Sequence, residues 1–233
     1  MSNPVQLIAM HGWCGDSRSW DPWLPSWQQQ GWTCSCGERG YGRLPPQQPT
    51  WGTTAGTKVV IAHSLGPHLL RPEVLAAADA VVLLTSFARF VPEGRAGRSV
   101  AAALGGMAAQ LRGPEPERML KSFLVQVAAP APADLLQASP AAEPLSAAGL
   151  ELLQQDLELI AQSTSLPAGF PPHAKVLLLE AGSDQIVDPA ARQELQRALP
   201  RADVLSFSAA GHGLIGTPTI AMVNAWIAAL LQS

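Results

Sequence analysis

Short runs of apolar residues recur along the chain, and polar or glycine-rich turns separate them. Uninterrupted runs of about four to eight such residues are typical of strands buried on both faces of a parallel sheet. On this pattern we expect strands at residues 5–10, 59–62, 80–87 and 175–180, and we also expect strands at 32–36 and 202–208. Helical spacing predicts helices over residues 23–31, from Pro67 onward, over 189–199 and over 218–231. The order strand, helix, strand within residues 59–87 indicates a right-handed crossover between parallel strands.

The strand pattern disappears between residues 90 and 170. This stretch is rich in Ala, Pro and Leu, and it contains helical patterns at Arg118 to Val127 and Gly149 to Ile160. Because strands resume after it, we interpret it as an inserted helical cap and not as an independent domain. The sequence therefore predicts a single α/β domain over residues 1–233 with a mainly parallel sheet of about six strands and a cap at about 90–170.

The composition is that of a compact globular protein. Of the 233 residues, 47% are hydrophobic and 14% are charged, and the formal net charge is −3. Nucleic-acid binders usually carry a basic excess, so we expect no nucleic-acid partner. The apolar runs are shorter than the ~20 residues that a membrane span needs, and the first residues lack the features of a signal peptide. We therefore expect a cytoplasmic protein that does not associate with membranes.

The cysteines do not indicate a metal or redox centre. Cys14, Cys34 and Cys36 are odd in number and lack the C-x-x-C spacing. Cys34 and Cys36 would share one face of a strand and are too close in sequence for an ordinary disulfide. We interpret these cysteines as small hydrophobic side chains, and we predict no metal and no cofactor.

Ser64 stands between a buried strand and the start of a helix. It is the central residue of Ala62-His63-Ser64-Leu65-Gly66, and the next residue, Pro67, suits the first turn of a helix. A serine with small residues two positions before and after it is typical of the nucleophile elbow, usually G-x-S-x-G. Ala62 departs from that pattern by one methyl group. On this pentapeptide alone, Ser64 could instead be an ordinary turn residue.

Further candidate catalytic residues also follow predicted strands. Asp184 comes after the strand at 175–180, and His212 comes after the strand at 202–208. Because the carboxyl ends of parallel strands share one edge of the sheet, Ser64, Asp184 and His212 are expected to converge there. Ser64 would be the nucleophile, His212 the base that takes its proton, and Asp184 the carboxylate that orients the imidazole.

An oxyanion formed at Ser64 would need N–H donors placed in advance. The elbow supplies the backbone N–H of Leu65, and the loop after the first strand would supply that of Trp13.

Other residues compete for the roles of acid and base. Asp188 is the alternative acid, but it precedes Pro189 and is expected to cap the following helix. His173 precedes a strand and would lie at the opposite edge of the sheet. The remaining histidines belong to the oxyanion loop or flank the elbow: His11, His63 and His68. We therefore assign the base to His212.

Over essentially its whole length the sequence resembles the α/β-hydrolase superfamily, whose triad has the same order of Ser, Asp and His. The resemblance rests on His11-Gly12-Trp13, Arg39-Gly40-Tyr41-Gly42, Ser64-Leu65-Gly66, Asp184 and His212. Within the superfamily it is most similar to the pimeloyl-[acyl-carrier protein] methyl ester esterases of biotin synthesis. Trp20, which follows the His11 segment, and the stretch 149–157 add to this closer similarity.

The closer resemblance implies a serine carboxylesterase that hydrolyses the methyl ester of pimeloyl-[acyl-carrier protein] methyl ester through an acyl-enzyme. An acidic carrier protein would require a basic docking surface. The first half of the predicted cap contains such cations: Arg89, Arg95, Arg98, Arg112, Arg118 and Lys121. We expect them to bind the carrier, although a solvated cap surface would have a similar composition.

Other functions fit the same residues. A general carboxylesterase or thioesterase would use this triad on a different acyl group. The loop from His11 to Trp20 also resembles the menaquinone-pathway lyase, in which the triad removes a proton and the serine is not acylated. A non-catalytic ligand receptor on the same fold is a further alternative. Acylation of Ser64 by an ester separates the hydrolases from the lyase and the receptor.

Overall fold

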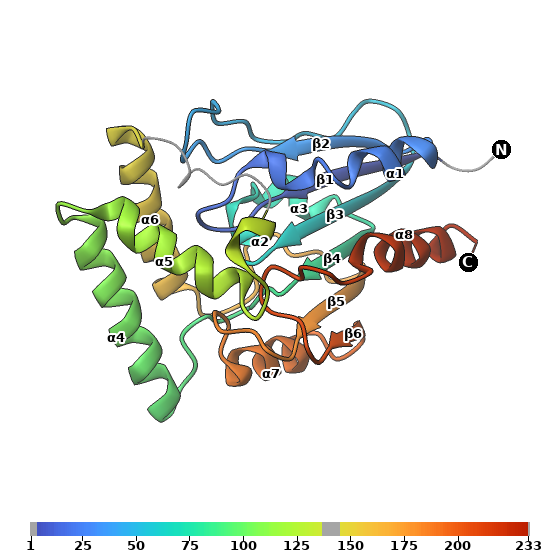
Figure 1. Cartoon of the computed structure of the whole chain (residues 1–233). Coiled ribbons are helices and arrows are strands. Elements are labelled where there is room, and N and C mark those ends of the chain that lie inside the picture. Colours follow the sequence, from blue (N-terminus) through green and yellow to red (C-terminus); the bar gives the residue numbers. More distant parts are fainter. Residues whose placement is uncertain (1–3, 137–144, 233) are drawn as a thin grey trace.

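A parallel sheet forms the centre of the protein. The computed structural model describes residues 4–136 and 145–232. Its strands are β1 (Val5–Met10), β2 (Thr33–Gly37), β3 (Thr57–His63), β4 (Ala80–Leu84), β5 (Lys175–Ala181) and β6 (Asp203–Phe207). They lie in the order β2-β1-β3-β4-β5-β6, and every neighbouring pair is parallel (Figure 1). The predicted sheet of about six mainly parallel strands is confirmed.

The order of the strands reverses direction beside β1. The chain passes from β1 to β2 on one side, and β3 then pairs with the other side of β1. Ligands of open parallel sheets bind at such a reversal, outside the carboxyl ends of the strands. The loops that leave β1 and β3 therefore occupy the position where a site is expected.

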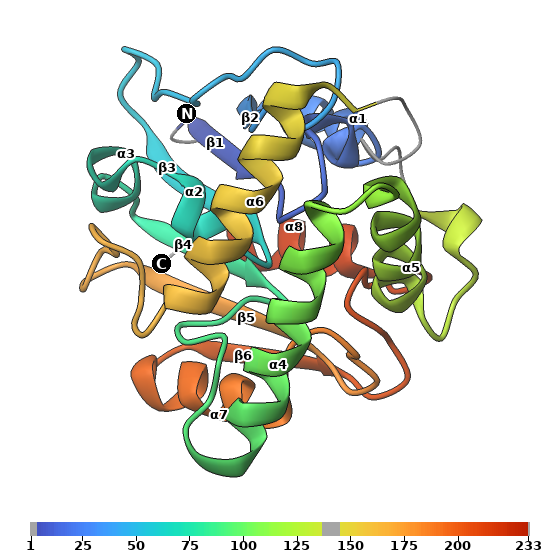
Figure 2. The same cartoon turned by 90° about the vertical axis from the view of Figure 1, so that its left-hand side faces the viewer.

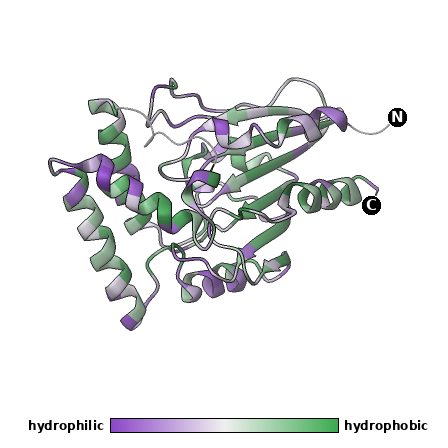
Figure 3. Cartoon of the chain, viewed as in Figure 1, coloured by the Kyte–Doolittle hydropathy of each residue, from purple (hydrophilic) through white to green (hydrophobic). Residues whose placement is uncertain are grey.

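Helices cover both faces of the sheet. Side chains of η1 (Ser17–Trp20), α1 (Leu24–Gln29) and α8 (Thr219–Leu230) pack on one face, with Val59 and Ile61 of β3. Side chains of α7 (Pro189–Ala198) and of the short helices after β3 pack on the other, with Val60 and Ala62. Alternate strand residues thus enter opposite layers, and the central strands are mostly hydrophobic in Figure 3.

β4 is shorter than the run at 80–87 predicts. It ends at Leu84, and Thr85 takes a positive φ of 44°. That left-handed conformation does not continue a strand. The turn places Thr85 and Ser86, both buried, at the carboxyl edge of the sheet.

The helix expected from Pro67 is also short. It consists of α2 (Gly66–Leu69), after which Leu70 and Arg71 are extended. Pro72 accounts for this break, because a proline ring disfavours helical backbone at the preceding residue. The chain becomes helical again as α3 (Pro72–Ala76).

A helical insertion lies between β4 and β5 in the sequence. It comprises α4 (Gly94–Leu111), α5 (Pro116–Ala128), η2 (Ala133–Leu135) and α6 (Ala147–Gln162). Viewed toward the carboxyl ends of the strands, α4 and α6 cross in front of the sheet (Figure 2). The buried side chains of Leu104, Leu120 and Leu157 join the insertion to the core. The helical patterns expected at 118–127 and 149–160 fall within α5 and α6.

Buried polar bonds fasten α6 to the loop after β2. Arg39 donates from Nε and Nη2 to the two carboxylate oxygens of Asp156, at 2.6 and 2.8 Å. The hydroxyl of Tyr41 donates to Asp156 Oδ2 at 2.6 Å. The bond to Asp156 raises the pKa of Arg39, and burial together with the Asp156 charge raises that of Tyr41. A bidentate pair of this kind is specific in geometry as well as in charge.

We predict that Asp156→Ala destabilises the protein by about 3 kcal/mol, because it leaves Arg39 beside α6 without its counter-charge. The free energy of unfolding from urea titration measures this loss. Glu158→Ala, at an exposed position of the same helix, is the control and should change stability by less than about 0.5 kcal/mol. Equal effects of the two substitutions would contradict a role for the Arg39–Asp156 pair.

Candidate active site

Ser64 occupies a strained turn at the end of β3. Its φ is 55°, in the left-handed region that residues with a side chain rarely adopt. Its backbone N–H donates to Leu84 O at 2.9 Å, and its carbonyl accepts from Ser86 Oγ at 2.7 Å. These bonds to the end of β4 hold the turn in place, as a nucleophile elbow requires.

Two glycines allow the chain to approach this turn closely. A Cβ on Gly66 would lie 2.5 Å from Met10 O, and a Cβ on Gly12 would lie 2.8 Å from Ser64 Cβ. Neither position can accept a side chain without a shift of the backbone. Ala62, by contrast, is fully buried between β1 and β4, so its extra methyl group is accommodated. The departure from G-x-S-x-G therefore leaves the elbow intact.

Asp184 and His212 form a buried pair. His212 Nδ1 lies 2.9 Å from Asp184 Oδ2, and Asp184 Oδ1 accepts from the amides of Ile186 and Val187. Burial alone would raise the pKa of Asp184, but His212 and the two amides hold that pKa below its ordinary value. Because an ionised carboxylate only accepts, His212 Nδ1 carries the hydrogen and Nε2 has a free lone pair. The alternative acid, Asp188, instead caps α7 through Ala190 N at 2.8 Å.

A hydrogen bond connects the backbone of His212 to His63, the residue that precedes Ser64. The carbonyl of His212 accepts from His63 Nε2 at 3.1 Å and from Thr85 Oγ1 at 2.9 Å. Within the described part of the chain, no hydrogen bond joins Ser64 Oγ to His212. Contacts between a nucleophile and its base are often long in unliganded enzymes and shorten when substrate binds.

The two predicted oxyanion donors belong to segments that contain or contact the elbow. Leu65 is fully buried and directly follows Ser64, and Trp13 follows Gly12, which contacts Ser64. Among the described residues, none accepts a hydrogen bond from the backbone N–H of Trp13 or Leu65. Neither amide is therefore committed to an acceptor within the described residues.

Hydrogen bonds within the loop, from α6 and from the residue after β2 hold the loop that carries Trp13. His11 Nδ1 donates to Gly12 O at 2.8 Å, and the indole Nε1 of Trp13 donates to Leu153 O of α6 at 2.9 Å. Glu38, at the end of β2, accepts from the amides of Ser17 and Gly40, at 2.8 Å each. Burial would raise the pKa of Glu38, but His11 and these amides lower it to about 2.

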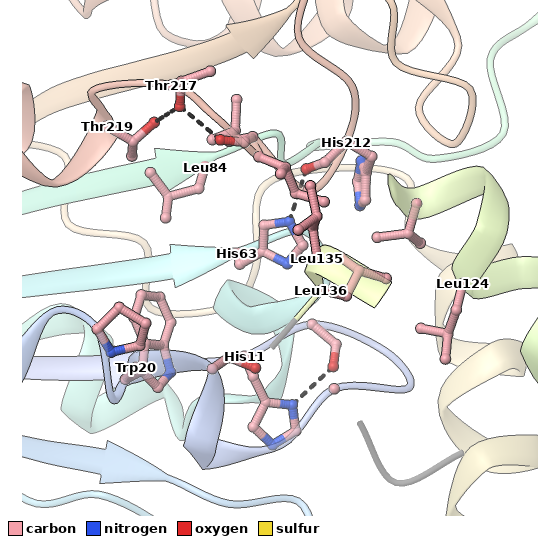
Figure 4. Close-up of a pocket in the computed structure, with 18 of the residues that line it drawn as sticks. His11, Trp20, His63, Leu84, Leu124, Leu135, Leu136, His212, Thr217 and Thr219 are labelled. Carbon is pink, nitrogen blue, oxygen red and sulfur yellow. Dashed lines mark hydrogen bonds between the residues drawn. The ribbon is translucent and has the colours of Figure 1, made fainter. Parts of the chain in front are cut away.

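A cavity of about 330 Å³ adjoins the pair. Its walls come from the loop after β1, the segment after His212, the start of α8, and the insertion (Figure 4). His63 and His212 line it, together with apolar side chains such as Trp20, Leu124 and Leu136. Among its described lining residues there is no Asp, Glu, Lys or Arg. Ser64 itself is only 7% exposed and is not one of them.

The six cations expected to bind a carrier protein do not form one patch. Arg95 lies in the first turn of α4 and Arg112 follows its last residue, so roughly 25 Å of helix separates them. Arg98 lies in α4 close to Arg95. Arg118 and Lys121 lie in α5, which begins shortly after Arg112. Arg89 is already paired, with Glu93 at 3.1 Å and Glu194 at 3.3 Å.

Membrane-spanning helices, metal-binding groups and the cysteines can be assessed among the described residues. In those ranges, no helix has both the length and the apolarity to cross a membrane. No group of three or more His, Cys, Asp or Glu side chains in them is arranged to bind a metal ion. Cys34 and Cys36 do share a face of β2, with their sulfurs 3.6 Å apart.

Solved structures with the same fold cover nearly the whole chain. An esterase from Exiguobacterium antarcticum has a TM-score of 0.69 at 16% identity, covering 100% of this chain and 94% of its own. A bromoperoxidase from Bacillus anthracis has a TM-score of 0.68 at 17% identity, with coverages of 99% and 92%. A structure reported with carboxylesterases of Nitrososphaera gargenis has a TM-score of 0.70 at 13% identity, with coverages of 99% and 91%.

No protein-family model and no curated protein matches the sequence. The structural likeness establishes the fold: the protein has the α/β-hydrolase fold.

Sequence reasoning did not find the residues that support the site. In the sequence His63 lies too close to Ser64 to complete a triad, and the pattern singles out neither Thr85 nor Glu38. The sequence does contain a signal for Glu38, because it comes two residues after the predicted strand at 32–36 and so lies at the carboxyl edge of the sheet. For Thr85 there was none, since it fell inside the predicted strand at 80–87.

We predict a pH dependence of stability from His63. Burial and the neighbouring His212 lower the pKa of His63 from 6.5 to about 3. Between these values the unfolded chain binds a proton that the folded protein does not, so stability falls as the pH falls. Between pH 6 and pH 5 the wild type should lose about 1 kcal/mol more than His63→Gln, measured by urea unfolding. Parallel losses in the two proteins would contradict a buried, neutral His63.

Proposed function

We propose that the protein is a serine carboxylesterase that hydrolyses uncharged esters with Ser64, His212 and Asp184. The observation that carries the proposal is the 2.9 Å bond between His212 Nδ1 and Asp184 Oδ2, held beside a serine with φ of 55°. This bond leaves His212 Nε2 as the free base at the edge of the sheet where Ser64 lies. The N–H groups of Trp13 and Leu65 supply the oxyanion donors that acyl transfer needs.

In the acylation step, Ser64 Oγ attacks the ester carbonyl carbon while its proton passes to His212 Nε2. The carbonyl oxygen becomes an oxyanion and accepts from the amides of Trp13 and Leu65. His212 then gives the proton to the alcohol oxygen, the carbon–oxygen bond breaks, and Ser64 is left as an ester. Asp184 stays ionised throughout and stabilises the imidazolium, in keeping with its lowered pKa.

In the second step, a water molecule replaces the alcohol. His212 Nε2 takes a proton from this water as the oxygen attacks the acyl carbon, and then returns it to Ser64 Oγ as the acid departs. The overall reaction consumes an ester and a water and releases an alcohol and an acid.

The cavity supports an uncharged substrate with an apolar part. Its described lining carries no formal charge outside the histidines, and its side chains include Trp20, Phe123, Leu124 and Leu136. A charged group in such surroundings would lose its hydration without a partner of opposite charge. An alkyl or aryl group loses nothing comparable and gains from burial.

A narrower proposal is that the ester is pimeloyl-[acyl-carrier protein] methyl ester. The sequence similarity described above supports it, and the cavity suits an apolar methylene chain. The exposed cations at the two ends of α4 would face an acidic carrier. Arg89 is the weakest candidate of the six, because two glutamates already engage it.

We predict hydrolysis of carrier-linked pimeloyl methyl ester and of short p-nitrophenyl esters, abolished by Ser64→Ala.

Asp184→Asn should lower kcat by about 10³- to 10⁴-fold, because His212 then loses its orientation and its correct tautomer. Asp188→Asn is the matched control and should keep activity, since asparagine also caps helices. Mass spectrometry should detect an acyl group on Ser64. Absence of Ser64-dependent turnover on both kinds of ester would contradict the esterase and favour the lyase or the receptor.

For the carrier, we predict that reversing Arg118 and Lys121 to glutamate raises KM for the carrier-linked ester about tenfold at low salt. Both substitutions place negative charge where an acidic protein would dock. The effect should shrink as salt is added, and KM for p-nitrophenyl esters should not change. Lys175→Glu, at the amino end of β5, is the control. If the double variant behaves like Lys175→Glu, these cations do not bind a carrier.

A further inference from the structure

We infer that His63 is a positioning residue that fixes the backbone of His212 and thereby aims its imidazole at Ser64. The inference rests on the proposed function, because it concerns the base of that mechanism. His63 is the last residue of β3, and its ring lies at the wall of the cavity, beside the segment that carries His212 (Figure 4).

The contact that carries the inference is made to a backbone atom. His63 Nε2 lies 3.1 Å from the carbonyl oxygen of His212. A carbonyl oxygen only accepts, so Nε2 of His63 must carry the hydrogen and donate it. Thr85 Oγ1 donates to the same oxygen at 2.9 Å. Both lone pairs of this carbonyl are therefore used, by donors at the ends of the adjacent central strands β3 and β4.

The imidazole of His212 is thereby fixed at two points. Its backbone is held by His63 and Thr85, and its Nδ1 is held by Asp184 at 2.9 Å. Little freedom remains for Nε2, the atom that must reach Ser64 Oγ. Because His63 and Ser64 are consecutive residues, the segment that carries the nucleophile also sets the place of the base. A displacement of about 1 Å between reacting groups can cost about 100-fold in rate.

The surroundings of His63 keep it in this role. Its ring centroid lies 4.9 Å from that of His212, and the other titratable groups that act on it are Asp184 and His11. Burial and the neighbouring His212 lower its pKa, so the ring is neutral where esterases work. Its other nitrogen, Nδ1, faces Gly12, where a Cβ would lie only 3.2 Å away. His63 is thus a donor to His212 and not a second base.

Three substitutions separate positioning from a general loss of packing. His63→Phe keeps a planar ring and removes the donor, whereas His63→Gln restores an N–H at similar reach. His68→Phe is the matched control, because His68 Nε2 also donates to a carbonyl, that of Phe87 at 3.2 Å, and does not contact His212. We expect kcat to fall about 10- to 100-fold in His63→Phe with KM within about twofold. His63→Gln and His68→Phe should stay within about threefold of the wild type.

A second measurement does not depend on ester hydrolysis. The His212 Nδ1 proton, bonded to Asp184, should give a downfield proton NMR signal in the wild type, His63→Gln and His68→Phe. It should be broadened or lost in His63→Phe, because the imidazole is then free to move. A wild-type signal in His63→Phe overturns the inference, as does an equal loss of kcat in His63→Phe and His68→Phe. Absence of Ser64-dependent hydrolysis would instead defeat the esterase proposal, and the NMR comparison would still decide the role of His63.

Discussion

The close approach of the chain leaving β1 to the turn leaving β3 is the constraint on which the candidate site depends. Met10 O leaves no room for a Cβ at Gly66, and Ser64 Cβ leaves none at Gly12. Gly12, which precedes Trp13, thus lies against Ser64, whose backbone is left-handed. Parallel pairing of β1 with β3 is what brings the two loops together, because both strands then end at the same edge. Close backbone contacts thus position the serine and the two amides that we propose as oxyanion donors.

The helical insertion completes this arrangement from the other side. The indole of Trp13 is bonded to Leu153 O, and Asp156, on the same helix, is bonded to Arg39 and Tyr41. The loop after β1 is therefore held between the sheet and α6. A displacement of α6 would move Trp13, the proposed oxyanion donor, so the insertion contributes to the geometry of the proposed site as well as to its walls.

Much of this could be predicted from the sequence, because the strongest signals are local. Buried strands produce uninterrupted apolar runs, and Ser64 and Asp184 each follow one. His212 follows the edge strand β6, so the shared edge of all three could be inferred without coordinates. What could not be predicted depends on contacts between distant segments. The bond from His63 to the His212 carbonyl spans 149 positions, and the bonds from Arg39 to Asp156 span 117. Neither leaves a pattern in its own neighbourhood. The separation of the insertion's cations could not be predicted for a related reason. Their number is visible in the sequence, but the length of α4 that separates them is a property of the folded helix.

The uncharged cavity also bears on how a turnover would end. An ester enters neutral, but the acid that leaves is an anion at neutral pH. The described walls offer it no lysine or arginine. The newly formed carboxylate would therefore be poorly solvated in surroundings that suit the uncharged ester. Hydrolysis would thus convert a ligand that binds well in the cavity into an anion that binds poorly, which would favour release of the acid product. An esterase built in this way would resist inhibition by accumulating acid.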